Sequence, residues 1–227
     1  MGSNHEPAVP IDAAPDHAPD VSIRRIVVGI AGSIGAFDVP SSILWLRHAY
    51  GAEVRAIMTR QATTMVTPRA IAVTSGHPVV IDGEGSLSDP VVPHIDLTRW
   101  AELFLVLPAT ANILGKAAQG IADDLLSTCI LASACPVVFV PNMNEQMWRK
   151  PAVQRNVATL QADGYGVVAP IKGRAVADGQ STGCVMPEID VVLRWVTSFI
   201  QQSATASAVN GTDHGMGNGI RQEVRAR

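Results

Sequence analysis

Two methionines, two asparagines and a tryptophan fall within residues 141–148 of the chain. The segment follows the apolar run 137–140 directly, so it lies where a buried strand gives way to a helix, and open α/β sheets bind their ligands at such places. Asn144 offers two amide donors and one acceptor, and Met143 and Met147 flank it with soft apolar surface. This combination suits a substrate that carries a thiol and a carboxylate. The alternative is a capped helix start whose methionines and tryptophan belong to the core.

A glycine-rich turn after the first expected strand is a second candidate site. Residues 29–35 read Gly-Ile-Ala-Gly-Ser-Ile-Gly and lead into an expected helix, whose free N–H groups and dipole favour a phosphate. The spacing departs from the dinucleotide fingerprint, and the second strand ends in Thr59-Arg60 instead of the acid that would hold a ribose hydroxyl. The turn therefore favours a mononucleotide over NAD, with Ser33 and Thr59 as hydrogen-bond partners. A tight turn that needs small residues would give the same pattern.

Two further segments carry polar residues of undecided role. The third strand runs into Pro-Ala-Thr-Ala-Asn at 108–112, where Asn112 either contacts a ligand or only caps the next helix. His94 stands beside apolar residues. It is either a structural histidine or a base, because imidazole titrates near pH 6.5.

The strands and helices that would position these residues are expected from an alternation of short apolar runs with longer amphipathic stretches. It is typical of a parallel sheet covered on both faces, so we expect an α/β fold with a Rossmann- or flavodoxin-like doubly wound sheet in three α/β/α layers. The expected strands are 25–30, 53–59, 103–107, 137–140 and 166–170, with 79–81 as a further short candidate. The expected helices are 35–50, 63–75, 112–134, 145–162 and 187–201. The rest of 76–96 is expected to form a loop.

The bulk properties indicate one globular domain at residues 23–202. The chain has 227 residues, 47% of them hydrophobic, and a formal net charge of -3. Its scattered 17 basic residues against 20 acidic ones argue against nucleic acid, and no apolar run is long enough for a membrane span. Residues 1–22 lack the apolar run of a signal peptide and are expected to form a disordered leader. Residues 203–227 are expected to form a disordered tail. We therefore expect a cytoplasmic protein. Three cysteines without C-x-x-C spacing favour neither a disulfide framework nor a metal site.

Five elements, in order, resemble those of the homo-oligomeric flavin-containing cysteine decarboxylases. The octet 141–148 is similar to the family's P-x-M-N-x-x-M-W signature, and 94–97 match its H-I-x-L context. The other three are the turn at 32–36, the segment 108–112, which resembles P-A-S-A-N-T, and the segment 120–128 that follows it. Together the resemblance covers roughly residues 24–188.

The resemblance implies an FMN enzyme that is assembled as a trimer, often further into a dodecamer, with the flavin between subunits. Such enzymes oxidise the Cα–Cβ–S unit of a C-terminal cysteine to a thioaldehyde, which eases the loss of CO2. Carried over by position, His94 would be the base, and Asn144 would orient the substrate carboxylate between Met143 and Met147. The residues that would hold FMN are Gly32, Ser33, Ile34, Thr59, Pro108, Ala109, Thr110 and Asn112.

One local difference favours a branch of this family. Phosphopantothenoylcysteine decarboxylases, of coenzyme A biosynthesis, carry an A-C-G-D motif whose cysteine returns electrons from the flavin to the product. Here the corresponding position holds Ala177, and Cys184 comes seven residues later. The resemblance therefore implies a peptidyl-cysteine decarboxylase that oxidises the C-terminal cysteine of a ribosomally synthesised precursor peptide to an aminoenethiol, with a dehydratase or cyclase as a further partner enzyme.

Three alternatives stay open at this point. The nearest is the phosphopantothenoylcysteine decarboxylase itself. A flavin prenyltransferase is more distant, because that family lacks the octet, and a non-catalytic FMN-binding regulatory subunit would be expected to carry a long acidic tail. The glycine-rich segment 172–187 is interpreted either as a lid over the peptide's end or as an ordinary connection.

Overall fold

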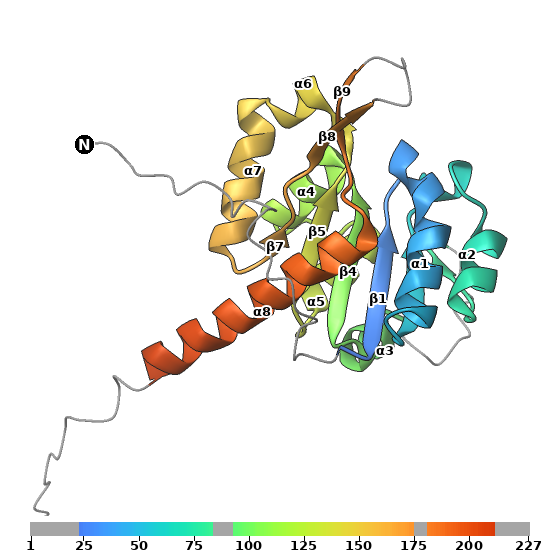
Figure 1. Cartoon of the computed structure of the whole chain (residues 1–227), viewed down its shortest axis with the longest axis horizontal. Coiled ribbons are helices and arrows are strands. Elements are labelled where there is room, and N and C mark those ends of the chain that lie inside the picture. Colours follow the sequence, from blue (N-terminus) through green and yellow to red (C-terminus); the bar gives the residue numbers. More distant parts are fainter. Residues whose placement is uncertain (1–22, 84–92, 175–180, 212–227) are drawn as a thin grey trace, which may run out of the picture.

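The computed structural model of the chain describes residues 23–83, 93–174 and 181–211, and a six-stranded parallel sheet forms its centre (Figure 1). The strands are β1 (Arg25–Ile30), β2 (Glu53–Met58), β3 (Val80–Ile81), β4 (Leu103–Ala109), β5 (Val137–Pro141) and β7 (Gly166–Val167). Their order is β3-β2-β1-β4-β5-β7, and every neighbouring pair is parallel. The direction of winding reverses between β1 and β4, which makes their carboxyl ends the topological switch point. The predicted doubly wound sheet is confirmed.

Two separate hydrophobic clusters cover the two faces of this sheet. On one face lie α1 (Val39–His48), α2 (Pro68–Ser75) and α8 (Ile189–Gly211), and on the other lie α3 (Pro93–Trp100), α4 (Ala111–Ala118), α5 (Leu125–Ala132) and α7 (Pro151–Ala162). Successive strand residues point to opposite faces. Leu105 of β4 therefore packs in the first cluster, and its neighbour Phe104 packs in the second. The three predicted layers follow from this alternation.

Two of the long predicted helices are each divided, so those predictions were wrong. Residues 112–134 form α4 and α5, because Gly120 takes a positive φ of 65° and Asp124 then starts a new helix through a capping box with Ser127. Residues 145–162 form the single turn α6 (Glu145–Trp148) and the separate helix α7. Pro151 begins α7, because a proline lacks the N–H that a continuous helix would need.

The other helix boundaries also shift. The short helices η2 (Ile34–Asp38) and η3 (Ala62–Thr64) precede α1 and α2, whose first turns contain Pro40 and Pro68. At the other end of the chain, α8 continues past residue 201 to Gly211, into the predicted tail. Its added residues include glutamine and alanine, which favour helix. The predicted leader 1–22 and residues 212–227 lie outside the described residues.

A second, antiparallel sheet replaces the predicted loop at 172–187. The strands β8 (Ile171–Arg174) and β9 (Ser181–Val185) form a hairpin, and β9 also pairs with β6 (Met143–Asn144). Ala177 lies outside the described residues. Gly173 allows the close approach of Val185 to the backbone of β8, where a Cβ would overlap that side chain. Sequence patterning missed the hairpin because its glycines hide the alternation of a strand.

The strand predicted at 166–170 ends at Val167. No helix among the described residues combines the length and the apolar character that crossing a bilayer requires.

Candidate functional site

A cleft of about 610 Å³ opens at the carboxyl edge of the sheet, at the switch point between β1 and β4. Its size is in the range of cofactor pockets. The ends of β1, β2, β3 and β4 contribute to its wall, together with α4, the loop before α5, and α6. Five residues predicted from the sequence line it: Gly32, Thr59, Thr110, Asn112 and Met147.

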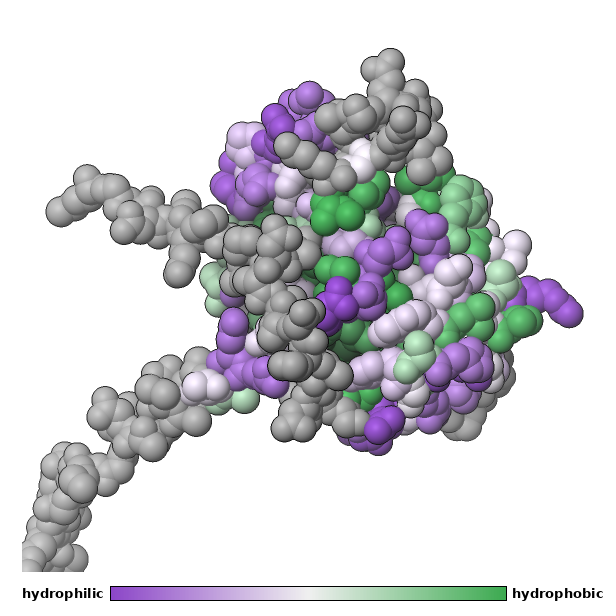
Figure 2. All heavy atoms as spheres, viewed as in Figure 1, coloured by the Kyte–Doolittle hydropathy of each residue, from purple (hydrophilic) through white to green (hydrophobic). Residues whose placement is uncertain are grey.

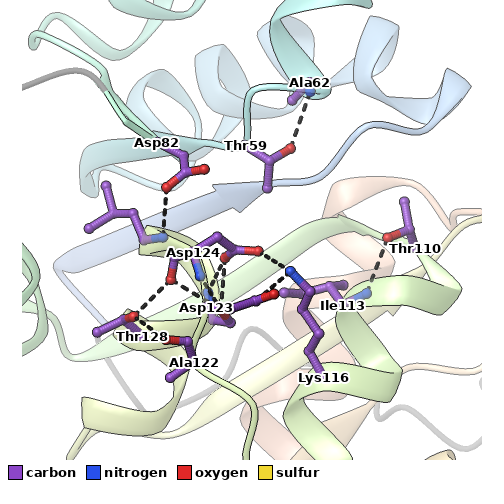
Figure 3. Close-up of polar contacts among 12 residues, drawn as sticks. Thr59, Ala62, Asp82, Thr110, Ile113, Lys116, Ala122, Asp123, Asp124 and Thr128 are labelled. Atoms are coloured by element: carbon purple, nitrogen blue, oxygen red, sulfur yellow. Dashed lines mark hydrogen bonds and ion pairs between the residues drawn. The ribbon is translucent and has the colours of Figure 1, made fainter.

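Two threonine hydroxyls in the cleft are fixed by the backbone (Figure 3). The Thr59 hydroxyl accepts from the Ala62 N–H at 3.2 Å, and the Thr110 hydroxyl accepts from the Ile113 N–H at 3.3 Å. Because each hydroxyl acts as an acceptor there, its own proton is available to donate to a ligand. Thr110 is the N-cap of α4, so the alternative that Asn112 is only an N-cap was wrong. Within the described residues, the Asn112 amide makes no hydrogen bond and faces the cleft.

The turns after β1 and β2 touch each other at Gly32. A Cβ at this position would lie 2.7 Å from the Cβ of Gln61 and 3.0 Å from its carbonyl carbon, so only glycine fits without movement. The backbone N–H groups of Gly32, Arg60 and Gln61 donate to no other described group. The cleft thus offers backbone donors, two hydroxyls and one amide, a set that suits the phosphate and ribityl hydroxyls of FMN.

An ion-pair cluster forms the opposite wall of the cleft. Lys116 Nζ lies 2.6 Å from Asp123 Oδ1 and 2.5 Å from Asp124 Oδ2 (Figure 3), and the hydrogen bonds to Asp123 and Asp124 raise the pKa of Lys116. Burial opposes ionisation of Asp124, but hydrogen bonds from Lys116 and Ser127 outweigh it and lower the pKa of Asp124. Asp82 Oδ1 accepts from the N–H of Leu125, at the start of α5.

Sequence reasoning did not single out Lys116, Asp82 or Asp124. The aspartate before the apolar run 125–126 was the available signal, because aspartate is a preferred N-cap residue. The ion pair of Lys116 could not be predicted, since it depends on the turn between α4 and α5.

Replacing Lys116 with methionine is expected to lower the free energy of unfolding at pH 7 by about 2 kcal/mol, because a largely buried carboxylate loses its counter-ion. The side chain of Asp124 is only 15% exposed. Its folded-state pKa is below the unfolded value of 3.8, so the stabilisation is present above that pH and is lost as the pH falls through the folded-state pKa. Urea unfolding should show that the free energies of unfolding of the variant and the wild type differ less in acid than at pH 7. Lys150→Met, at an exposed lysine, is the control.

The predicted substrate residues lie on β6 and α6. The Asn144 Oδ1 caps α6 by accepting from the Gln146 N–H at 2.7 Å, which leaves the NH2 group of the amide as a donor. Pairing of Asn144 with Gly183 and of Met143 with Cys184 fixes the backbone. The capped-helix alternative is therefore right for Asn144. It is also right for Met143 and Trp148, which pack against the core. It fails for Met147, which is 46% exposed and lines the cleft.

Asn142, which sequence reasoning did not assign to the site, joins the turn after β1 to the end of β5. Its Oδ1 accepts from the Gly35 N–H at 3.2 Å and also from the Ser33 hydroxyl, and its side chain is buried. Ser33 is therefore engaged by the protein and does not line the cleft. Ile34 lies on η2, also outside the cleft lining.

Pro108 and Ala109 act through the backbone. The Ala31 N–H donates to the Pro108 carbonyl at 3.3 Å, and the Asn142 N–H donates to the Ala109 carbonyl at 3.0 Å. These bonds align the ends of β1, β4 and β5. Neither residue lines the cleft, so their contact with a cofactor stays a prediction.

His94 lies in the first turn of α3, a helix that contacts α5 and β1. The side chain of His94 is outside the described part of the structure, and its role as a base stays a prediction. Within the described residues, no group of three or more histidine, cysteine, aspartate or glutamate side chains could hold a metal ion.

Comparison with known proteins identifies this arrangement. The chain is 40% identical to the coenzyme A biosynthesis bifunctional protein CoaBC of Bacillus subtilis over 150 residues, which cover 66% of this chain and 37% of that protein. The chain thus spans less than half the length of this relative. It is 34% identical to mersacidin decarboxylase of a Bacillus species over 149 residues, 66% of this chain and 75% of that protein.

A solved structure is also similar to this chain in both fold and sequence. The FMN-dependent cysteine decarboxylase SpaF has a TM-score of 0.68 and 39% sequence identity, and the match covers 80% of this chain and 98% of SpaF. The family described as Flavoprotein matches residues 16–201, which include every element of the cleft. The predicted recognition is thereby confirmed, and the chain belongs to the flavoprotein family.

Proposed function

We propose that the chain is an FMN-dependent decarboxylase that acts on the C-terminal cysteine of a ribosomally synthesised precursor peptide and yields an aminoenethiol. The similarity to SpaF and to mersacidin decarboxylase supports a cysteine decarboxylase. The observation that carries the choice of branch is Ala177, at the position where the coenzyme A branch is expected to have its cysteine. Sequence identity does not separate the branches, because it is 40% to CoaBC and 39% to SpaF.

The residues of the site suit this reaction. Bound FMN would accept the two electrons and one of the two protons that leave the Cα–Cβ–S unit, the other being the thiol proton. The Thr59 and Thr110 hydroxyls and the Asn112 amide hold the cofactor at the switch point. The free NH2 of Asn144 donates to the substrate carboxylate until it leaves as CO2.

Three other side chains complete the proposed mechanism. Met147, which lines the cleft, and Met143, which packs against the core, would give the thiol apolar surroundings. His94 takes the proton of the substrate thiol, as an imidazole can near neutral pH.

The choice between branches depends on Cys184. Burial raises the pKa of Cys129 to about 12 and also raises the pKa of Cys135, so neither supplies a thiolate at neutral pH. Cys184 pairs with Met143 across β9 and β6, next to Asn144. It is therefore the cysteine to test for a redox role.

Replacing Cys184 with alanine is expected to change peptide decarboxylation less than about threefold, because the proposed reaction ends at the oxidised product and needs no protein thiol. Steady-state rates of the wild type and the variant would be compared by mass spectrometry, with Cys135→Ala as the control. An inactive Cys184 variant that still binds FMN would contradict the proposal and favour the coenzyme A branch.

The test of the proposed function is mass spectrometry of a short synthetic peptide that ends in Ser/Thr-x-x-x-Cys, after incubation with the FMN-loaded protein in air. Loss of CO2 together with two hydrogens would support oxidative decarboxylation. An unchanged peptide, together with phosphopantothenoylcysteine that loses CO2 alone, would assign the chain to coenzyme A biosynthesis. The similarity to CoaBC is the observation that supports this alternative.

We also propose the assembly that the sequence predicts, a homotrimer that associates into a dodecamer. Large apolar side chains are exposed on η2 and α1, beside the glycine turn of the cleft: Ile34, Phe37 and Leu44. Sedimentation of the FMN-loaded protein would report the number of subunits. A dehydratase or cyclase partner and a cytoplasmic location are further proposals.

A further inference from the structure

The cleft is lined by two cationic side chains, of which one is paired with carboxylates and the other is not. Lys116 is neutralised by Asp123 and Asp124, which are 2.6 and 2.5 Å from its Nζ. Arg60 lines the same cleft, follows directly after Thr59, and forms no ion pair with any described residue. Arg60 is thus the cation of the cleft whose charge is available to a ligand.

The Arg60 side chain extends to Gly83, two residues after β3. The guanidinium lies against the backbone of Gly83, where a Cβ would overlap its Nη2. Gly83 has a φ of 75°, which glycine adopts at no steric cost. The nearby carboxylate of Asp82 is engaged by the N–H of Leu125 and does not pair with Arg60. The guanidinium therefore lies at the cleft without an ion-pair partner among the described residues.

Donors suited to an anion line the same cleft as this guanidinium. The backbone N–H groups of Arg60, Gln61 and Gly32 have no described acceptor, and the Thr59 hydroxyl retains its proton for donation. The wall formed by α4 and the loop before α5 carries the carboxylates of Asp123 and Asp124. A phosphate monoester would be repelled by these two carboxylates and favoured at the turns after β1 and β2.

We propose that Arg60 binds the phosphate of the flavin and makes the chain select FMN over riboflavin. A guanidinium forms two parallel hydrogen bonds to a phosphate, a geometry that an ammonium does not reproduce. The inference rests on the flavin site of the proposed function. It adds the residue that binds the charged phosphate of the cofactor. The same chemistry could instead serve a phosphorylated substrate, and the experiment separates the two.

The test measures the dissociation constants of FMN and riboflavin by fluorescence quenching of the full chain after removal of its flavin. Arg60→Gln is expected to weaken FMN binding about ten- to a hundredfold, because it removes a charge-assisted hydrogen bond, while riboflavin binding changes less than about twofold. Added salt should weaken FMN binding to the wild type more than to the variant. Arg60→Lys should recover only part of the loss.

Arg69→Gln is the matched control, since Arg69 is an exposed arginine of α2 that does not line the cleft. It should leave both constants unchanged. Circular dichroism establishes that the Arg60 variants are folded, and their riboflavin binding shows that the cleft is intact.

An unchanged ratio of FMN to riboflavin affinity in Arg60→Gln would overturn the proposal. A second result would also overturn it. In that result Arg60→Gln keeps the wild-type ratio of flavin affinities, raises the KM for phosphopantothenoylcysteine and leaves the KM for the dephosphorylated form unaltered, because Arg60 would then bind the phosphate of the substrate. The titrations need no turnover, so they stay informative if the peptide substrate of the proposed function is wrong.

Discussion

Replacing Asn144 with aspartate is expected to reduce peptide decarboxylation about a hundredfold or more while the melting temperature stays close to that of the wild type. Aspartate keeps the oxygen that caps α6 through the Gln146 N–H. It replaces the NH2 donor with an oxygen and a negative charge, which repels the substrate carboxylate. The variant therefore separates the structural role of residue 144 from its proposed chemical role.

The measurement is the rate of CO2 loss under single-turnover conditions with saturating FMN, beside a thermal melt. Asn144→Ala serves for comparison, because it removes the donor and also the cap, at a cost of about 1 kcal/mol in stability. Turnover of the aspartate variant within a few-fold of the wild type would show that Asn144 does not bind the carboxylate.

The second large effect is expected for Gly32→Ala, which should weaken the binding of FMN and riboflavin alike by about tenfold or more. The added Cβ would lie 2.7 Å from the Cβ of Gln61 and 3.0 Å from its carbonyl carbon, so the two turns must move apart. The movement displaces the backbone donors of both turns, whatever the charge of the ligand. Loss of both flavins distinguishes this variant from Arg60→Gln.

Fluorescence titration with each flavin checks this result, and Gly115→Ala is the matched control. Gly115 lies inside α4, where a Cβ would meet only the Asn156 amide at 3.4 Å. Alanine there favours the helix and should leave flavin binding unchanged. Wild-type affinity for both flavins in Gly32→Ala would mean that the turn after β1 does not contact the cofactor.

The parts of the fold that sequence could predict are those set by local periodicity. The strands β1, β4 and β5 are apolar runs between turn residues, and the end of each carries part of the site or aligns it. The flavoprotein family and the flavin cofactor predicted from the motifs are confirmed by the comparisons, and the similar proteins include an FMN-dependent cysteine decarboxylase.

The parts that sequence missed depend on contacts between distant segments. The hairpin of β8 and β9 gains its partner from β6, and its glycines conceal a strand pattern. The buried amide of Asn142 bonds to a turn that is more than a hundred residues away in the chain. Pro151 and Gly120 divide two predicted helices, and both residue types are sequence signals of a helix boundary.

The polar surface over α6 and the start of α7 is a further property of this region (Figure 2). Arg149 pairs with Glu145 one turn earlier, and Lys150 and Arg155 are exposed. A single helical turn is too short to be stable alone. The cap by Asn144 and the packing of Trp148 on the core therefore hold α6 in place.

The pairing of β9 with β6 fixes the backbone around Asn144 at one end of the hairpin. Residues 143 and 144 are anchored by the root of the hairpin, through Cys184 and Gly183. Insertions or deletions between β8 and β9 change the length of the connection without shifting this register. A single-residue insertion within β9 would instead turn every following side chain to the opposite face. A change in the length of the connection can therefore leave the backbone geometry around Asn144 intact.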